Sequence, residues 1–183
     1  YTDPSTSITF QSFPVSSRTD GPSRFGIALP PAGTAQMILQ ITAPLARSSV
    51  GWGGLALGAN MRGPLLLVAW PDPATKSITI APRVAQSYDV DGTVPYTDKP
   101  LTLSPIKAGT YYNATHLSAT FVCTGCFGDG DSGLGYLSYA YGLEGVKDPG
   151  RKDTELSDHT DGGDQGGFEV DVEGARNQKF GEW

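Results

Sequence analysis

A methionine in a glycine-rich segment is the first residue of this chain whose type and setting could do chemistry. Met61 ends the segment 51–61, which carries glycines at positions 51, 53, 54 and 58. These glycines leave room for a flat group to lie close to the backbone, where a Cβ would clash. The Met61 thioether is a soft metal ligand, although a methionine beside an apolar run also commonly fills a gap in a core. The segment by itself leaves both interpretations open.

The two histidines are the other candidate metal ligands, because neutral imidazole binds metals readily. His116 falls on the more polar face of the alternating stretch 113–123, so we expect a solvated surface side chain there. His159 lies in an acidic, glycine-bearing stretch, and the carboxylates of Asp158 and Asp161 could hold its second ring nitrogen. A solvent-exposed loop histidine is the alternative for His159.

The two cysteines, Cys123 and Cys126, stand three positions apart. Covalent haem attachment at such a pair requires a histidine directly after it, and Phe127 occupies that position. A zinc site would need a second pair, and the βαβ context of a thioredoxin-like redox pair is missing. We therefore interpret the pair as a local structural disulfide that ties the end of a strand to its turn.

Three further motifs carry weaker signals. The chain has no Gly-x-Ser-x-Gly elbow of a serine hydrolase. Alternating carboxylates in the segment 128–133 would suit calcium, but the other ligands of a calcium loop are missing, so we favour a glycine-rich turn. Asn113 begins an Asn-Ala-Thr sequon, which makes it a candidate glycosylation site.

Composition limits the class of partner. The 183 residues carry a net charge of −6, so nucleic acid or an anionic membrane surface would be repelled. The longest apolar runs are far shorter than the roughly 20 residues that span a bilayer. We expect residues 1–183 to form one domain. The start at Tyr1 and the close cysteine pair suggest that it is a processed or excised domain of a larger secreted protein.

The elements that must position these residues are short strands. The 24 glycines and 14 prolines are spread along the chain, as is typical of strands joined by tight turns. No long stretch has a helical period, so the sequence predicts an antiparallel β-sandwich or a distorted barrel. The expected strands are 7–13, 24–29, 36–42, 65–70, 77–80, 101–103, 111–112, 114–122, 134–141 and 167–172. The polar stretch 144–167, which contains His159, is too long for a hairpin, and such loops are often functional.

Three motifs taken together, in this order, resemble those of a known family. They are the segment 52–61, the Val-Cys-Thr-Gly-Cys motif at 122–126, and His159 followed by Gly-Gly-Phe-Glu-Val-Asp at 166–171. Over essentially the whole chain, the sequence is similar to the haem b cytochrome domain of fungal cellobiose dehydrogenase and to related iron-reductase-type cytochromes. This resemblance implies an all-β, immunoglobulin-like antiparallel β-sandwich with a non-covalent haem b at one edge.

The resemblance also implies roles for individual residues. Met61 and His159 would be the axial ligands of the haem iron, and Cys123 and Cys126 would form a disulfide. Arg83 is the basic residue that we expect to contact a haem propionate. A thioether and an imidazole fill both axial positions and raise the reduction potential of the iron, which suits outer-sphere electron transfer rather than oxygen activation.

By the same resemblance, the chain would be an extracellular electron-transfer domain rather than a catalyst by itself. It would take single electrons from a flavin- or quinone-dependent sugar dehydrogenase, on the same or a separate chain. Its acceptor would be a lytic polysaccharide monooxygenase or ferric iron. The alternative is a carbohydrate-binding β-sandwich without haem, in which exposed aromatic side chains stack on sugar rings; the candidates are Trp52, Trp70, Tyr136, Tyr139 and Tyr141.

Overall fold

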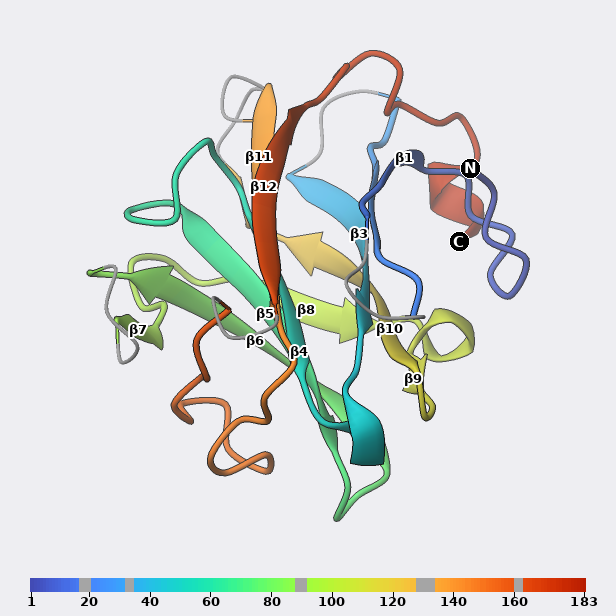
Figure 1. Cartoon of the computed structure of the whole chain (residues 1–183). Coiled ribbons are helices and arrows are strands. Elements are labelled where there is room, and N and C mark those ends of the chain that lie inside the picture. The colour runs from blue at the N-terminus through green and yellow to red at the C-terminus, as the bar shows by residue number, and fades with distance from the viewer. Residues whose placement is uncertain (17–20, 32–34, 88–91, 128–133, 160–162) are drawn as a thin grey trace.

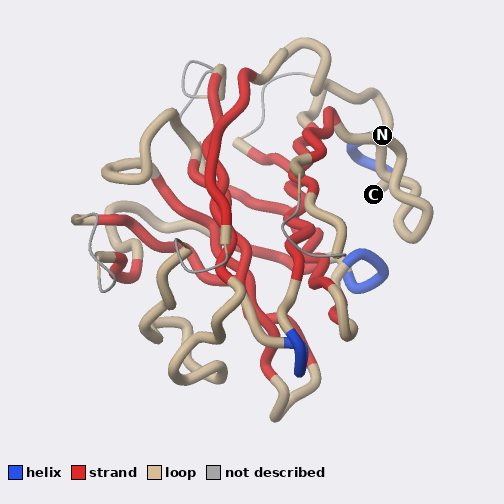
Figure 2. Tube along the Cα trace, in the orientation of Figure 1, coloured by secondary structure: helices blue, strands red, loops and turns tan. Residues whose placement is uncertain are grey.

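The computed structural model describes residues 1–16, 21–31, 35–87, 92–127, 134–159 and 163–183. Within these ranges the chain forms two six-stranded antiparallel sheets that pack against each other (Figure 1). Strands and loops make up nearly all of the described chain (Figure 2), and its helical structure consists of 3-10 turns at Arg47–Ser49, Lys107–Gly109 and Phe180–Glu182. No helix there is long and apolar enough to cross a membrane. The predicted all-β sandwich is confirmed.

The first sheet joins the beginning and the middle of the chain. Its strands follow the order β1-β2-β3-β10-β8, and a short strand, β9, also pairs with β10. The bounds are β1 Gln11–Pro14, β2 Arg24–Ala28, β3 Gln36–Pro44, β8 Thr102–Pro105, β9 Tyr111–Tyr112 and β10 His116–Thr124. The β3–β10 ladder runs from His116 opposite Pro44 to Thr124 opposite Gln36, so it spans the full length of both strands.

The second sheet carries the glycine-rich segment at its centre. Its order is β12-β11-β4-β5-β6-β7, so the late strand β11 pairs with β4. The bounds are β4 Trp52–Ala56, β5 Leu65–Asp72, β6 Ser77–Ala85, β7 Thr93–Pro95, β11 Tyr136–Gly142 and β12 Asp164–Glu169. This crossover brings two loops close together: the loop after β4, which carries Met61, and the loop between β11 and β12, which carries His159.

The main core lies between the two sheets. Side chains alternate between the faces of a strand, and on β3 the inward-facing Met37, Leu39 and Ile41 are all fully buried. Leu55 and Leu67 on the second sheet belong to the same cluster. Each large apolar side chain buried in this way stabilises the fold by about 1.5–3 kcal/mol. This core is therefore the main source of stability, and it is separate from the outer face of the second sheet.

That outer face is covered by residues 143–159, which we call the strap (orange in Figure 1). The strap has no strand or helix of its own. Its Val146 and Leu156 form a second apolar cluster with the outward-facing Trp52, Trp70 and several smaller side chains of the sheet. Since His159 ends the strap, this packing determines where the candidate ligand lies.

Most of the predicted strands are present in the structure, with a few differences. β4 was not among the predicted strands, and β6 runs to Ala85 instead of ending at residue 80. β7 was not expected, because Thr93–Pro95 is short and ends in a proline. β5 continues through Pro71 to Asp72, where it pairs with β6 only. Its pairing with β4 ends at Ala69, so the amide that Pro71 lacks removes no hydrogen bond to β4. β12 starts at Asp164 rather than at Gly167, so the loop that carries His159 is shorter than expected. The segment 128–133, where a glycine-rich turn was favoured over a calcium site, lies outside the described residues.

Candidate functional site

Met61 and His159 line the same cavity. This cavity has a volume of about 470 Å³ and is bounded by β4, β5, β11, β12, the loop after β4 and the end of the strap. Pockets for small molecules and cofactors commonly have volumes of about 300–1,000 Å³. Both side chains are half-buried, so each is held by the protein while part of it remains accessible. The fold therefore brings together two residues that lie almost a hundred positions apart in the sequence.

The floor of the cavity consists of very small side chains. The strand registers place Ala56 opposite Ser138 and Gly54 opposite Ala140, and Gly167 of β12 faces Ser138 from the other side. All five residues line the cavity, and we call them the floor. Side chains no larger than a hydroxymethyl group leave the sheet surface flat, and a flat surface suits a planar ligand. The sequence analysis saw only the glycines of this set. The alternation of Ser138 and Ala140 with large side chains on β11 could have marked these two as one face of small residues, but not their pairing with Gly54 and Ala56.

The loop that carries Met61 is fixed at both ends. The Leu57 amide donates to the Leu65 carbonyl at 2.9 Å, which closes the β4–β5 hairpin. The Gly63 amide donates to the Ala85 carbonyl at 3.3 Å, and Gly63 has a φ of +96°, a left-handed conformation that glycine adopts easily. Met61 packs against the outer apolar cluster. Its sulfur is thus presented from a constrained hairpin loop.

His159 is approached closely by Trp52 and by the chain that follows. The two rings meet edge to face, with centroids 6.4 Å apart and planes inclined at 70°. A Cβ at position 163 would collide with the carbonyl oxygens of His159 and Tyr141, so Gly163 is required where the chain passes the histidine. Asp161, a candidate partner for the second ring nitrogen, lies outside the described residues.

His116 lies on the first sheet and does not line the cavity. Its ring nitrogens lie 3.0 Å from the Thr115 hydroxyl and 3.5 Å from the Tyr111 hydroxyl. Partial burial lowers the pKa of this imidazole. Only one of the two histidines is therefore placed to act together with Met61.

Arg83 is buried behind the cavity rather than in its lining. The side chain is only 1% exposed, and its guanidinium donates to the Thr93 carbonyl, the Thr93 hydroxyl and the Lys152 carbonyl at 2.6–3.2 Å. Burial lowers the pKa of Arg83, and the carboxylate of Asp153 partly opposes this shift. Thr93 itself lines the cavity, so Arg83 supports the wall from behind. The expected contact between Arg83 and a haem propionate stays a prediction.

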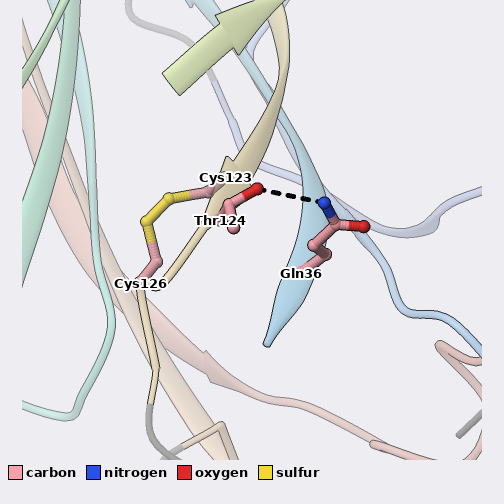
Figure 3. The surroundings of a disulfide bond; sticks show 4 residues. All are labelled: Gln36, Cys123, Thr124 and Cys126. Atoms are coloured by element: carbon pink, nitrogen blue, oxygen red, sulfur yellow. Dashed lines mark hydrogen bonds between the residues drawn. A yellow bond between two sulfur atoms is a disulfide. The ribbon is translucent and has the colours of Figure 1, made fainter. Parts of the chain in front are cut away.

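The cysteine pair forms a disulfide (Figure 3), and neither cysteine lines the cavity. Cys123 and Cys126 have Cα atoms 5.9 Å apart, at the end of β10. Between them, Thr124 accepts a hydrogen bond from the Gln36 amide at 3.1 Å, and the Gly125 amide donates to the Ala35 carbonyl. The predicted structural disulfide is confirmed. The candidate glycosylation site Asn113 is exposed, in the turn before β10.

The cavity residues fit a haem better than a sugar or a simple metal ion. Among the described residues, no group of three or more His, Cys, Asp or Glu side chains could hold a metal ion. A thioether and an imidazole are an established axial pair for haem iron, and the flat floor accommodates a planar ring. The indoles proposed for sugar stacking are buried, with Trp52 6% and Trp70 0% exposed, and Tyr141 is also fully buried. Trp70 and Tyr141 are therefore not available to stack on sugar rings, whereas Trp52, Tyr136 and Tyr139 line the cavity itself.

Comparisons with known proteins agree with this assessment. The family model for the cytochrome domain of cellobiose dehydrogenase matches residues 1–182. The fold is shared with the solved cytochrome domain of cellobiose dehydrogenase from Myriococcum thermophilum, which has a TM-score of 0.81 and 24% sequence identity over 100% of this chain and 92% of that one. It is also shared with the cytochrome b domain of pyranose dehydrogenase from Coprinopsis cinerea, with a TM-score of 0.74 and 24% identity over 100% of this chain and 91% of that one. The chain therefore belongs to the family of cytochrome domains of cellobiose dehydrogenase.

Proposed function

We propose that this chain is an extracellular electron-transfer domain that binds haem b non-covalently, with Met61 and His159 as the axial ligands of the iron. The observation that carries this proposal is that both side chains line one cavity with a flat floor. The other methionine, Met37, is fully buried between the sheets, and His116 lies outside the cavity. Met61 and His159 are thus the one pair of methionine and histidine that the cavity offers.

The residues of the cavity define the chemistry. Haem bound there would supply a one-electron couple. With the Met61 sulfur and the His159 imidazole both holding the iron, no position on it would be left for a substrate, and electrons would pass through the edge of the ring. The apolar lining from Leu66, Val68 and Leu156 lowers the local dielectric constant, and a methionine ligand in such surroundings favours the reduced state.

The electron donor is a sugar dehydrogenase, on the same chain or on a separate one. Both solved relatives are named for sugar dehydrogenases, which supports this class of donor. The acceptor that we propose is a lytic polysaccharide monooxygenase or ferric iron. The Cys123–Cys126 disulfide supports an oxidising, extracellular location, and the exposed Asn113 sequon is compatible with glycosylation there.

Absorption spectra of the purified chain supplied with haem test this proposal. The wild type should show the sharp reduced bands of a six-coordinate low-spin b-type haem, while Met61→Ala and His159→Ala should each convert to a high-spin spectrum or lose the haem. His116→Ala is the matched control and should keep the wild-type spectrum. A wild-type chain that remains colourless with haem would refute the proposal.

A further inference from the structure

Three buried donors from three adjacent strands hold the strap by its backbone. The Trp70 indole donates to the Pro149 carbonyl at 2.9 Å, the Arg83 guanidinium to the Lys152 carbonyl at 3.0 Å, and the Trp52 indole to the Ser157 carbonyl at 3.2 Å. The donors lie on β5, β6 and β4, and none is more than 6% exposed. The strap is therefore bonded to the sheet at three points along its length.

These bonds control whether the strap can leave the sheet. Lifting the strap would break the hydrogen bonds of the two indole N–H groups and the bond from Arg83 to Lys152, while Arg83 would keep its bonds to Thr93. It would also expose Val146 and Leu156. Within the strap, the Lys147 amide donates to the Glu155 carbonyl at a long 3.3 Å, and the Asp148 amide donates to the Thr154 hydroxyl at 2.8 Å. The strap thus has hydrogen bonds of its own, and the three sheet donors determine where it lies on the sheet.

Trp52 is the donor that acts nearest to the candidate ligand. Its indole N–H contacts both the carbonyl and the hydroxyl of Ser157, at 3.2 and 3.0 Å, two residues before His159. The Ser157 hydroxyl in turn donates to the Glu144 carbonyl at 2.9 Å, which ties the end of the strap to its beginning. A Cβ on Gly142 would collide with the Trp52 indole nitrogen, so the neighbouring strand leaves room for this ring.

We propose that Trp52 is the positioning residue for His159: it fixes the end of the strap through Ser157, and its ring packs against the imidazole in a T-shaped arrangement. The proposal rests on the proposed function of His159 as a haem ligand. Because every one of these contacts is made by the protein alone, the imidazole is already held before haem arrives. Haem then binds to a preorganised ligand and does not have to order a free loop.

A matched pair of variants tests the proposal. Trp52→Phe and Trp70→Phe each remove one buried indole N–H that bonds the strap. Ser157, the partner of Trp52, lies two residues from His159, whereas Pro149, the partner of Trp70, lies ten residues away. Trp52 also lines the cavity, so the haem-free measurements on Ser157→Ala separate the positioning of His159 from a lost contact between Trp52 and haem. We expect Trp52→Phe to speed haem dissociation about tenfold, the equivalent of roughly 1.4 kcal/mol, and to alter the reduction potential. Trp70→Phe should change dissociation less than about threefold. The same increase in both variants, or none in Trp52→Phe, would overturn the proposal.

Two measurements on the haem-free chain keep this result separate from the proposed function. Trypsin cleavage after the exposed Arg151 and Lys152 reports opening of the strap, and it should be faster than in wild type for both tryptophan variants. The second measurement is proton NMR, which resolves the signals of the two histidine rings. It is made on Ser157→Ala, a variant that removes the hydroxyl partner of Trp52 and leaves the Trp52 ring in place. This variant should shift the His159 signal and leave His116 unchanged as an internal control. An unchanged His159 signal would contradict the positioning role even if haem binding itself failed.

Discussion

Arg83 is a cation that the fold keeps almost completely out of water, and its position explains why its role could not be predicted from local sequence. The predicted strand ended at residue 80, so the sequence put Arg83 neither on a strand nor on a covered face, whereas in the structure β6 continues to Ala85. The strap, which comes some seventy residues later, buries it and supplies the Lys152 carbonyl. A buried charge is stable only when its donors are satisfied, and Arg83 meets this condition through Thr93 and Lys152.

Replacing Arg83 should therefore destabilise the haem-free protein. Arg83→Met leaves buried carbonyls without donors, and we expect the free energy of unfolding to fall by about 3 kcal/mol. Arg83→Lys should recover little, since a single ammonium cannot reach both Thr93 and Lys152 in the geometry of a guanidinium. Urea unfolding of the haem-free chain measures both effects.

The exposed Arg47 provides the control for this measurement, because Arg47→Met should change the unfolding free energy by less than about 0.5 kcal/mol. A propionate contact makes a different prediction for Arg83. It would leave the unfolding free energy of the haem-free Arg83→Met variant unchanged and weaken haem binding only.

At the level of elements, the floor of the cavity depends on strand register. Gly54 stands opposite Ala140 on one side and Val68 on the other, so its missing side chain is a gap in an otherwise continuous row. A Cβ at Gly54 would make ordinary contacts of 3.5 Å with Trp52 and Val68. The protein itself therefore tolerates a side chain at position 54, so we attribute the glycine to the space that haem needs above the floor.

Larger residues at position 54 should separate folding from cofactor binding. Gly54→Ala and Gly54→Val should leave the melting temperature of the haem-free chain unchanged or raise it, since glycine weakens a strand by roughly 0.5–1 kcal/mol. Haem affinity should fall progressively, by at least about tenfold for valine, because its methyl groups occupy the floor. Titration of the haem-free chain with haem measures the affinity. The control is Gly181→Ala, which lies outside the cavity and has no atom within 4 Å of the new Cβ, so it should affect neither the melting temperature nor the haem affinity. Unchanged haem affinity in Gly54→Val would show that the floor is not the binding surface.

The same elements show which parts of the fold a sequence can reveal. The β-sandwich and most strands could be predicted, because alternation and turn residues are local signals, and a motif resemblance singled out Met61 and His159. The tryptophans were harder to interpret, since an indole serves equally well on an exposed sugar-binding face and under a covering loop. Trp52 and Trp70 are buried only because the strap crosses the sheet there. The floor was missed for a related reason: Ser138 and Ala140 become neighbours of Gly54 and Ala56 only through a crossover between distant strands.

At the level of the whole molecule, the core and the cavity lie on opposite faces of the second sheet. Leu67, Ala69 and Tyr141 belong to the main core, whereas Gly54, Ala56 and Ala140 line the cavity. The first set packs against the other sheet and needs no ligand. The fold should therefore form without haem, and haem should add stability only through mass action.

Removal of haem tests this separation. The haem-free chain should keep the far-ultraviolet circular dichroism of a β-protein and unfold cooperatively, because the core between the sheets is intact. Adding haem should raise the melting temperature with concentration, approaching about 2.7 kcal/mol of added stability at a free concentration 100 times the dissociation constant. In His159→Ala the haem-free melting temperature should match that of the wild type, while the rise with haem should be much smaller. If the haem-free wild type lacked a cooperative transition, the cavity would be part of the folding core, and the independence of the two faces would be wrong.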